Sequence, residues 1–465
     1  MKKILLTAMG SGQGKTVVCC ALLAALKKRG MEVRAFKAGP DYIDPMFHSR
    51  VLGVPSRNLD LFLQGEESVR RSLRRHGGEL AVLEGAMGYY DGLNGGDEAS
   101  AWDLARKTDT PAILILRPKG SALTLAAQIR GLQSFREKSM LAALLLNDCS
   151  ESSFAYLKPL LERETGLPVL GWLPHREEAE LPSRHLGLLT AEEITDLRER
   201  FQALALQLEQ TVDLDALLAL AAEEEGEAAP EKPKAVCRIA VARDEAFCFC
   251  YADTLESLEQ AGAELVFFSP LRDAALPEKI AGLYLPGGYP ELHAEALSAN
   301  GGMRRSVAAA LERGLPAVAE CGGFLYLQRF LEDENGRGWP MCGVLPGEGY
   351  RTPRLQRFGY SVLEAEGDSL LFRAGERIPV HEFHHWDCTD KGADLRSRKP
   401  DGRSWPCCVA TDSLYAGFPH LSFAGNPATA ERFVAACVRY GNKLRKLKYS
   451  LQHYVNKVTF TILRK

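Results

Sequence analysis

A glycine-rich loop near the start of the chain constrains its fold most strongly. The apolar run Ile4–Ala8 leads into Met9-Gly10-Ser11-Gly12-Gln13-Gly14-Lys15-Thr16, and an amphipathic stretch follows. A buried strand, a glycine turn and a helix in this order direct backbone N–H groups and a helix N-terminus toward one ligand. The ligand that suits such a loop is a phosphate group. The sequence therefore predicts a nucleotide-binding α/β sheet at the start of the chain.

The residue types in this loop predict individual roles. Lys15 would reach the β and γ phosphates, and the Thr16 hydroxyl would bind Mg²⁺. The strict pattern G-x4-G-K-[ST] requires glycine at position 9, where Met9 stands, so the pattern fails by one residue. The surrounding strand and helix still favour a bound nucleotide over an ordinary glycine-rich turn. The residues expected around the phosphates are Gly10, Ser11, Gly12, Gln13, Gly14, Lys15 and Thr16.

Three acidic residues follow predicted strands, where an open α/β sheet binds its ligand. Glu84 ends one apolar run, and Asp41 and Asp44 follow the run Val33–Lys37. The carboxyl ends of parallel strands face the ligand crevice, and carboxylate oxygens are suitable ligands for Mg²⁺. We therefore expect Thr16, Asp44 and Glu84 to hold the metal ion, with Asp41 in the same site.

Apolar runs alternate with amphipathic stretches in both halves of the chain, which predicts two doubly wound α/β domains with mainly parallel sheets. The acidic segment 222–235 lacks large apolar residues and is predicted to be a linker. It separates a domain at 1–221 from one at 236–442, and a basic tail follows at 443–465. The expected strands are Ile4–Ala8, Val33–Lys37, Leu80–Glu84, Ala112–Leu116, Leu141–Leu146, Arg238–Ala242, Glu264–Phe268, Gly282–Leu285 and Ala317–Glu320, and the expected helices are Thr16–Arg29 and Ala122–Phe135.

Composition limits the location and partners of the chain. The net charge of −3 over 465 residues gives no basic excess that would predict nucleic-acid binding. No stretch approaches the roughly 20 apolar residues of a membrane helix, and the first apolar run is too short for a signal peptide. We therefore expect a cytoplasmic protein without a membrane partner, and a homodimer is left open. The basic tail is expected to be solvated, with contact to a partner or anionic substrate as the alternative.

One of the twelve cysteines has the surroundings of a nucleophile. Cys321 follows the apolar run Ala317–Glu320 and precedes Gly322-Gly323. A sharp strand-to-helix turn exposes a nucleophile, and we expect the helix N-terminus to lower the pKa of the thiol. The backbone N–H groups of Gly322 and of Gly288 upstream are expected to form an oxyanion hole. A buried structural cysteine is the alternative.

Five longer blocks of the sequence are informative together: Phe36–Pro45, Val82–Gly92, Leu181–Leu188, Ala242–Phe247 and Gly287–Glu291. They resemble the cobyrinate a,c-diamide synthase family, and the resemblance covers about residues 1–440. This family belongs to a wider group that includes dethiobiotin synthetase, whose phosphate loop is one residue longer than the strict pattern. The longer loop accounts for Met9, and Ala8 then stands where the longer pattern has its first glycine.

The resemblance implies a glutamine-dependent ligase of cobalamin biosynthesis. ATP would phosphorylate a carboxylate of a corrinoid, and ammonia from glutamine would displace the phosphate, so that the a and c acetate groups become carboxamides. It also implies an adenine contact for Asn147, which ends a predicted strand. The residues implied for the ATP, magnesium and activation site are Lys15, Thr16, Lys37, Asp41, Asp44 and Glu84.

A glutamine-splitting cysteine needs a base, and the candidates are His381, His384, His385 and His420. Class I glutamine amidotransferases place the base after a short apolar strand near the domain's end. Leu414–His420 resembles that block, so His420 is the predicted base. Many relatives outside the family have glutamate two residues later and the family more usually has histidine, whereas Ser422 stands here. The site is then a Cys–His dyad, or its third member comes from elsewhere in the chain. The other three histidines either line the interface with the synthetase domain or pack internally.

Other functions remain open on the sequence alone. The same reaction could act on hydrogenobyrinic acid or a nickel tetrapyrrole, and a cobyric acid synthase-like enzyme would amidate other side chains of the ring. The block Lys37–Asp44 favours the a,c enzyme. A ParA-like nucleotide switch with an inactive amidotransferase-like domain is the alternative from another class. The presence of both Cys321 and His420 argues against it.

Overall fold

The chain forms two compact units, Met1–Pro230 (unit 1) and Glu231–Lys465 (unit 2). The computed structural model describes residues 1–176, 191–228 and 230–462, with side chains except at 191–193 and 447–462. The boundary at Pro230 falls inside the segment expected to be a linker. The block Leu181–Leu188, which contributes to the family resemblance, lies outside the described residues.

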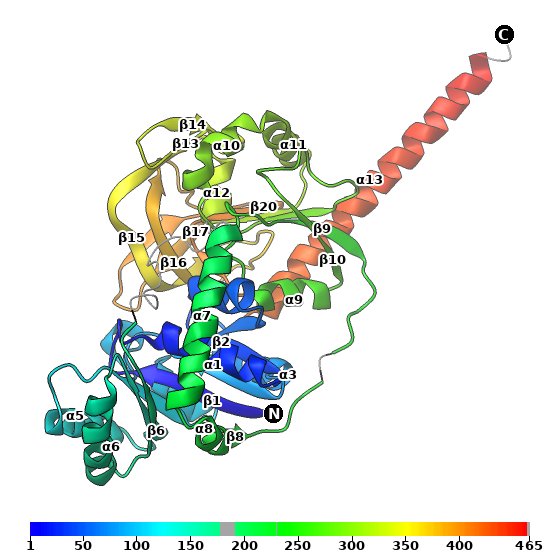
Figure 1. Ribbon diagram of the computed structural model, residues 1–465. Coiled ribbons are helices and arrows are strands. Elements are labelled where there is room, and N and C mark those ends of the chain that lie inside the picture. The colour runs from blue at the N-terminus through cyan, green and yellow to red at the C-terminus, as the bar shows by residue number, and fades with distance from the viewer. Residues whose placement is uncertain (177–190, 229, 463–465) are drawn as a thin grey trace. The chain divides into compact units, whose positions relative to one another are not determined.

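Unit 1 is built on a parallel sheet with the strand order β3-β2-β4-β1-β5-β6-β7. Figure 1 labels β1, β2 and β6 of this sheet. Its strands are β1 (Lys2–Ala8), β2 (Val33–Ala38), β3 (Ser56–Leu59), β4 (Leu80–Glu84), β5 (Ala112–Leu116), β6 (Leu141–Asn147) and β7 (Val169–Leu173), and β8 (Ala222–Glu223) pairs antiparallel with β1. Its helices are α1 (Lys15–Lys28), α2 (Ile43–Met46), the π-helical η1 (Phe47–Val51), α3 (Gly65–His76), η2 (Leu93–Gly95), α4 (Ala101–Lys107), α5 (Leu123–Ser134), α6 (Glu151–Thr165), α7 (Ala191–Thr211) and α8 (Leu214–Leu220).

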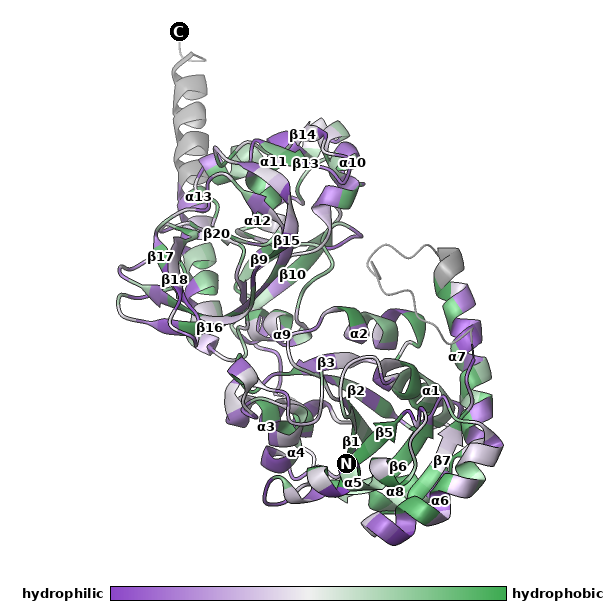
Figure 2. Cartoon of the chain, turned by 90° about the vertical axis from the view of Figure 1, so that its left-hand side faces the viewer, coloured by the Kyte–Doolittle hydropathy of each residue, from purple (hydrophilic) through white to green (hydrophobic). Residues whose placement is uncertain are grey.

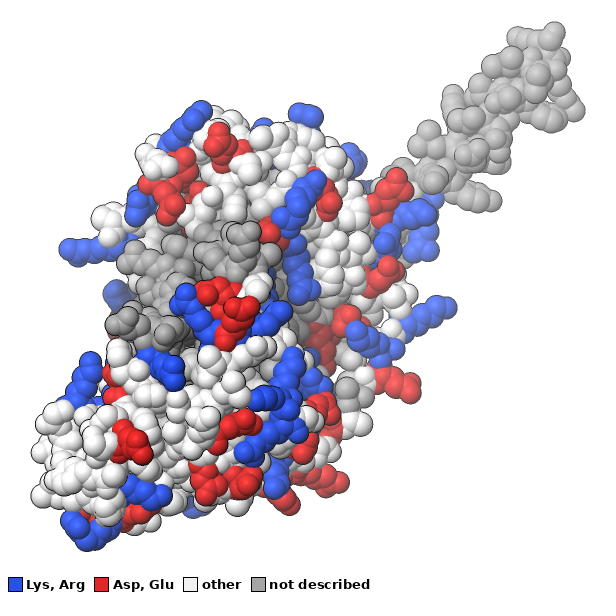
Figure 3. Space-filling model, in the orientation of Figure 1, with Lys and Arg blue, Asp and Glu red and all other residues white. Residues whose placement is uncertain are grey.

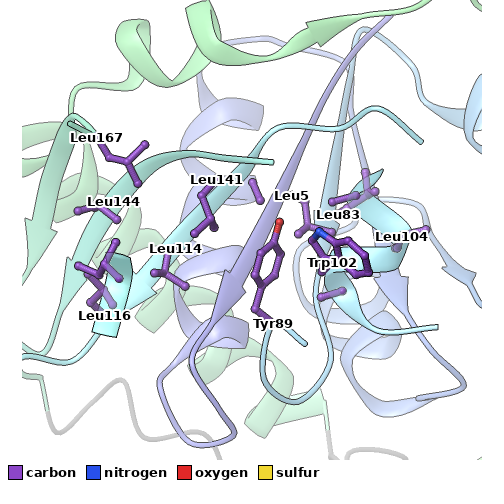
Figure 4. Packing of buried hydrophobic residues seen from close by; sticks show 14 of the residues in the cluster. Leu5, Leu83, Tyr89, Trp102, Leu104, Leu114, Leu116, Leu141, Leu144 and Leu167 are labelled. Carbon is purple, nitrogen blue, oxygen red and sulfur yellow. The ribbon is translucent and has the colours of Figure 1, made fainter. Parts of the chain in front are cut away.

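The central strands of unit 1 are buried on both faces, which explains why they are continuous apolar runs rather than alternating ones. Hydrophobic residues concentrate in β5 and β6, while hydrophilic residues mark helices α6 and α7 (Figure 2). On one face of the sheet, Leu5, Leu83 and Leu114 pack with Tyr89 and Trp102 (Figure 4). The predicted parallel α/β architecture is confirmed in this unit.

Unit 2 has a second parallel sheet, with the order β10-β9-β11-β12-β20 and β19 antiparallel at one edge. Its strands are β9 (Cys237–Ala242), β10 (Ala263–Phe268), β11 (Gly282–Leu285), β12 (Ala317–Glu320), β19 (Val409–Ala410) and β20 (Leu414–Gly417). The helices of the unit are α9 (Ala252–Gln260), η5 (Pro290–His293), α10 (Ala294–Ala299), α11 (Gly301–Glu312), α12 (Gly322–Leu327) and α13 (Pro427–Ile462). The predicted parallel architecture is confirmed here too.

Unit 2 also contains a mainly antiparallel sheet that the sequence analysis did not predict. Its central pair, β15 and β16, has many polar and exposed positions, so no apolar run marks it. Its strands are β13 (Phe330–Glu332), β14 (Gly338–Pro340), β15 (Glu348–Ala365), β16 (Arg377–Cys388), β17 (Leu395–Arg398), β18 (Ser404–Cys407) and β21 (His420–Leu421).

The expected linker and tail contain regular structure. Strand β8 lies inside segment 222–235 and pairs with β1, and Glu227 forms ion pairs with Arg74 and Arg75 of α3. The first part of that segment is thus bound to unit 1. Helix α13 continues through most of the basic tail. Among the described residues, no helix is long and apolar enough to cross a membrane.

Charged side chains of both signs are interspersed over the face of each unit that Figure 3 presents. This mixture agrees with the small net charge of −3. That face therefore offers no surface of a single charge sign that would steer a charged ligand toward the chain.

The close approach of β7 to the end of α7 generates a stability prediction. A Cβ added to Gly171, whose φ is +154°, would lie 2.1 Å from the Thr211 carbonyl oxygen. Overpacking against backbone costs about 1–3 kcal/mol, so we expect Gly171→Ala to lower the thermal unfolding midpoint of the full chain by several degrees. Gly131→Ala in α5 meets nothing within 4 Å and is the control, expected to leave the midpoint unchanged or raised. Equal midpoints for the two variants would contradict this packing.

Candidate active sites

The glycine loop of unit 1 joins β1 to α1 and is shaped by left-handed glycines. Gly12 has φ +75° and Gly14, the N-cap of α1, has φ +86°. A Cβ on Gly14 would lie 2.2 Å from the Asn147 amide nitrogen, and that amide donates to the Gln13 carbonyl at 3.0 Å. The structure thus places Asn147, at the end of β6, against the loop itself.

The loop is open on the side where phosphates are expected. A Cβ added to Gly10 or Gly12 would meet nothing within 4 Å, and Ser11 is exposed. Lys15, the first residue of α1, turns back and donates to the Gly10 carbonyl at 2.9 Å and to the Met87 carbonyl. Its ammonium therefore lies beneath the loop with two neutral partners, in position to meet an anion.

The surroundings of Lys15 disfavour its charged form. Burial and the nearby Lys37 charge lower the pKa of Lys15 to about 8, against smaller raising effects of Glu84 and Asp44. A phosphate bound in the loop would favour the charged lysine and raise its pKa.

A buried carboxylate, Glu84, organises the rest of this site. Strands β2 and β4 are parallel neighbours with Lys37 opposite Glu84, so both side chains meet at the carboxyl ends of their strands. The Glu84 Oε1 atom accepts from Lys37 Nζ at 2.9 Å and from the Thr16 hydroxyl at 2.7 Å. Its Oε2 lies 3.1 Å from His48 Nε2. Burial alone would raise the pKa of Glu84, but Lys37, His48 and Thr16 bring it well below its usual range.

The two predicted aspartates differ in their contacts. Asp44 forms an ion pair with Lys37, whereas Asp41 accepts from the Ile43 backbone N–H at 2.7 Å. Burial raises the pKa of Asp44, as does Glu84, and Lys37 opposes both. For Lys37 burial would lower the pKa, but Glu84 and Asp44 outweigh it and hold the ammonium charged. The predicted residues Lys15, Thr16, Lys37, Asp44 and Glu84 are thus linked by direct contacts or charge effects.

The predicted nucleophile of unit 2 sits on a strained turn. Cys321 joins β12 to α12 with φ +47° and ψ −100°, a conformation that non-glycine residues rarely adopt. Its backbone N–H donates to the Gly417 carbonyl at 2.7 Å, which ties the turn to the end of β20. A residue held in this way has its side chain set by the fold before any ligand binds.

Glycines allow three loops to converge on Cys321. A Cβ on Gly322 would lie 3.0 Å from the Gly288 backbone nitrogen, so the two predicted oxyanion N–H groups are near one another. A Cβ on Gly287 would lie 2.5 Å from His420 Cε1. The structure therefore brings the predicted base to the same loop as the predicted oxyanion donors.

Glu320, which the sequence analysis did not assign, lies beside the base. Its Oε2 atom is 3.8 Å from His420 Nδ1 and accepts from the Tyr284 hydroxyl at 2.9 Å. Its Oε1 accepts from the Leu421 backbone N–H at 3.0 Å. Burial raises the pKa of Glu320 to about 8, and these two donors reduce the effect.

Burial dominates the protonation of the catalytic pair. The pKa of Cys321 is raised by burial and by the charges of Glu291 and Glu382, and the Gly322 N–H lowers it by less. The expectation that the helix N-terminus gives this thiol a lowered pKa is therefore wrong for the chain without substrate. Burial also lowers the pKa of His420 to about 3, and His381 and His384 add to this. Burial therefore favours the neutral form of both groups.

The other candidate histidines, His381, His384 and His385, are placed differently. His384 stacks on Phe418 at 3.9 Å and lies 3.2 Å from Glu382, while His381 pairs with His420 across β16 and β21. Both are buried within unit 2, and His385 is exposed. The Ser422 hydroxyl is buried and has no hydrogen-bond partner among the described residues. The carboxylate found beside the His420 ring is that of Glu320.

His48 and Glu320 are the site residues that sequence reasoning missed. His48 lies on the π-helix η1, and no pattern in the sequence links it to Glu84. Glu320 was read only as the end of a strand. An acidic residue directly before the nucleophile, in an otherwise apolar strand, was the available signal.

Comparisons with known proteins agree with this division of the chain. Residues 4–189 match the CobQ/CobB/MinD/ParA nucleotide binding domain, and residues 238–427 match the CobB/CobQ-like glutamine amidotransferase domain. A protein of Clostridium tetani named cobyrinate a,c-diamide synthase is 39% identical over 434 residues, covering 92% of this chain and 98% of its own. Proteins of that name from Listeria innocua and Salmonella typhimurium are 40% and 39% identical, covering 92% and 94% of this chain and 98% of each relative.

Both sites, each in its own unit, agree with what these matches imply. A phosphate loop with lysines and carboxylates at strand ends occupies the nucleotide-binding domain, and a cysteine elbow with a histidine occupies the amidotransferase domain. The sequence identity extends over nearly the full length of the relatives. The chain therefore belongs to the cobyrinate a,c-diamide synthase family.

Proposed function

We propose that this chain amidates the a and c acetate groups of cobyrinic acid by way of acyl phosphates, with ATP and glutamine as co-substrates. As a family member it is a glutamine-dependent ligase that forms C–N bonds. The observation that carries the residue-level proposal is the approach of the Gly287–Gly288 loop both to Gly322, directly after Cys321, and to His420. A cysteine on a strand-to-helix turn with a base and oxyanion donors nearby suits acyl transfer from an amide, and the match to a glutamine amidotransferase domain makes glutamine that amide.

In unit 1 the carboxylate oxygen of the substrate attacks the γ-phosphorus of ATP, and the bond to ADP breaks. The loop N–H groups and Lys15 hold the phosphates, and Lys37 keeps the Glu84 and Asp44 carboxylates at the activation site. Phosphoryl transfer depends mostly on position and charge. Ammonia then attacks the acyl carbon, and phosphate leaves as the amide forms.

The donor set of unit 1 fits Mg²⁺. The Thr16 hydroxyl, Asp44 and Glu84 offer hard oxygen atoms that are already linked through Lys37 and a direct hydrogen bond. When bound, Mg²⁺ supplies charge neutralisation for the phosphates. Lys37 and His48 hold the Glu84 carboxylate in place, and Asp41 orders the turn that carries Asp44.

In unit 2 Cys321 attacks the carboxamide carbon of glutamine while its proton passes to His420. The N–H groups of Gly288 and Gly322 stabilise the oxyanion. His420 then gives its proton to the departing ammonia, and water hydrolyses the thioester to glutamate. We assign the proton transfer to Nε2, because Nδ1 is the atom that faces Glu320.

Glu320 is proposed as the positioning residue for His420. An imidazolium in this buried place is costly, as the depressed pKa of His420 indicates. A carboxylate at the 3.8 Å distance found here offsets that cost by about 4 kcal/mol at an effective dielectric constant near 20. Glu320 would therefore favour the proton transfer from Cys321 without touching the substrate.

Product analysis tests the function directly. The protein is incubated with ATP, Mg²⁺, glutamine and one tetrapyrrole at a time: cobyrinic acid, hydrogenobyrinic acid or a nickel tetrapyrrole. We expect mass spectrometry to show two added amides on cobyrinic acid. Amidation of another ring alone would move the proposal to that substrate, and amidation of none would contradict it.

Removal of the nucleophile should separate the two nitrogen sources. We expect Cys321→Ala to abolish glutamine-dependent amidation while free ammonia still supports it, because only thioester formation is lost. Amide formation is measured with each nitrogen source. Cys237→Ala, at the amino end of β9 and so at the opposite end of the parallel sheet, is the control and should retain both activities. Full glutamine-dependent activity in Cys321→Ala would show that the nucleophile is misassigned.

Lys15→Ala should have the opposite effect. We expect ATP-dependent synthesis to fall by at least about 100-fold, since a preorganised charge at the phosphates is lost, while some glutaminase activity persists. Lys28→Ala removes an exposed lysine from the last turn of the same helix and should change neither activity. Loss of both activities in folded Lys15→Ala would mean that the two reactions are coupled or wrongly divided.

The proposed role of Glu320 predicts a pH dependence. The pKa of Glu320 is raised to about 8, so its carboxylate form increases as the pH rises through that value. We expect kcat/KM of the wild-type glutaminase to rise over this range. Glu320→Gln should lose that limb and lower glutaminase kcat by about 10- to 100-fold, with ammonia-dependent synthesis retained. An unchanged pH profile with unchanged kcat would remove Glu320 from the mechanism.

A further inference from the structure

A cavity of about 590 Å³ lies in unit 2 between β15 and the β17–β18 hairpin. It belongs to neither site described above. One wall comes from β15 and the other from the hairpin and its turn. The residues that line it are Leu355, Arg357, Phe358, Lys399, Arg403, Ser404 and Trp405.

The cavity contains a buried positive charge without an acidic partner. Lys399 is only 7% exposed, and its ammonium donates to the Phe358 carbonyl at 2.6 Å. Among the described residues it forms no ion pair within 4.0 Å. Burial lowers its pKa, and Arg403 adds to this against the raising effect of Glu382. A buried ammonium is normally paired, so an anionic ligand would complete this arrangement.

The two arginines of the cavity have different roles. Arg357 is committed to Glu382 and Asp387 at 3.2 and 2.9 Å, so it forms part of the wall. Arg403 is 74% exposed and pairs only with Asp401 among the described residues, at the turn of the hairpin. Its guanidinium can therefore move to a ligand at small cost. No acidic side chain lines the cavity in the described part of the chain.

Two other residues of the lining, Leu355 and Phe358, are apolar and face solvent. Phe358 is 56% exposed and Leu355 37% exposed, and Phe358 stands edge-on to the exposed Phe383 at 5.3 Å. Large apolar groups that gather at a cavity mark a ligand-binding surface more often than a plain surface.

The backbone of β15 is bent at this cavity. The register with β16 shifts between Arg351 and Gln356 and again between Gln356 and Gly359, and Arg357 has φ +45°. Such bulges re-aim side chains and are frequent beside functional sites. Here the bulges orient the β15 side chains that line the cavity.

We propose that this cavity binds one edge of the corrinoid macrocycle, with Lys399 and Arg403 on acidic side chains of its rim that are not being amidated. The proposal rests on the proposed substrate. A corrinoid acid combines an apolar ring with carboxylates around it, and the cavity combines apolar walls with an unpaired ammonium. Its volume holds part of such a ring rather than all of it.

Two smaller anionic ligands fit less well. Glutamine carries an ammonium beside its carboxylate and would need an acidic partner, which the lining lacks. ATP is expected to bind at the glycine loop of unit 1, where Lys15 can contact its phosphates. Both ligands nevertheless define outcomes of the test.

Steady-state kinetics of the full-length protein tests the proposal, with ammonia as nitrogen source so that glutamine binding plays no part. We expect Lys399→Met to raise the KM for the corrinoid acid about tenfold and Arg403→Ala a few-fold, with the KM for ATP unchanged. Because Lys399→Met removes a buried unpaired charge, its thermal midpoint should not fall. A merely structural lysine would show the reverse, a lowered midpoint with unchanged KM.

Arg377→Ala is the matched control, since Arg377 is 62% exposed and ion-paired to Glu364 but lies outside the cavity. It should leave every KM unchanged. A rise in the KM for ATP would make the cavity a nucleotide site, and a rise in the KM for glutamine in a glutaminase assay would make it an amino-acid site; either result overturns the proposal. Unchanged values in both cavity variants also overturn it. Failure of the wild-type protein to amidate the corrinoid would instead contradict the proposed function.

Discussion

The fully buried carboxylate of Glu84 is the interaction on which unit 1 depends. It receives a lysine from β2, a threonine from α1 and a histidine from η1, so one group joins three elements. A buried carboxylate without such partners would cost several kcal/mol. The folded chain therefore fixes Lys37 and Thr16 at the open phosphate loop before any nucleotide arrives, which is the preorganisation that phosphoryl transfer requires.

Unit 2 uses burial in a different way. Glycines let the Gly287–Gly288 loop approach both His420 and the turn that carries Cys321. Burial favours the neutral form of the Cys321 and His420 side chains. A neutral thiol suits an enzyme whose cysteine should stay unreactive until glutamine binds. We infer that the nucleophile is activated only when substrate binds and the proton moves to His420, with Glu320 as the counter-charge.

Sequence reasoning was strongest where burial on both faces leaves a simple pattern. The central parallel strands are continuous apolar runs, and their ends pointed to Glu84, Cys321 and the loop before Lys15. The β15–β16 pair was not predicted because it is polar, half-exposed and bulged. It therefore shows neither a continuous apolar run nor a regular alternation of apolar and polar residues. Glu320 and His48 were missed because their roles come from contacts across the fold, with Glu320 meeting a residue 100 positions later.

The central claim of this account is that each carboxylate is activated by phosphorylation before ammonia arrives. The most direct measurement uses cobyrinic acid labelled with ¹⁸O in its a and c carboxyl groups, incubated with ATP, Mg²⁺ and glutamine. The account predicts that one labelled oxygen passes to inorganic phosphate for each amide formed. Label in AMP, or none in phosphate while the amides form, would contradict it.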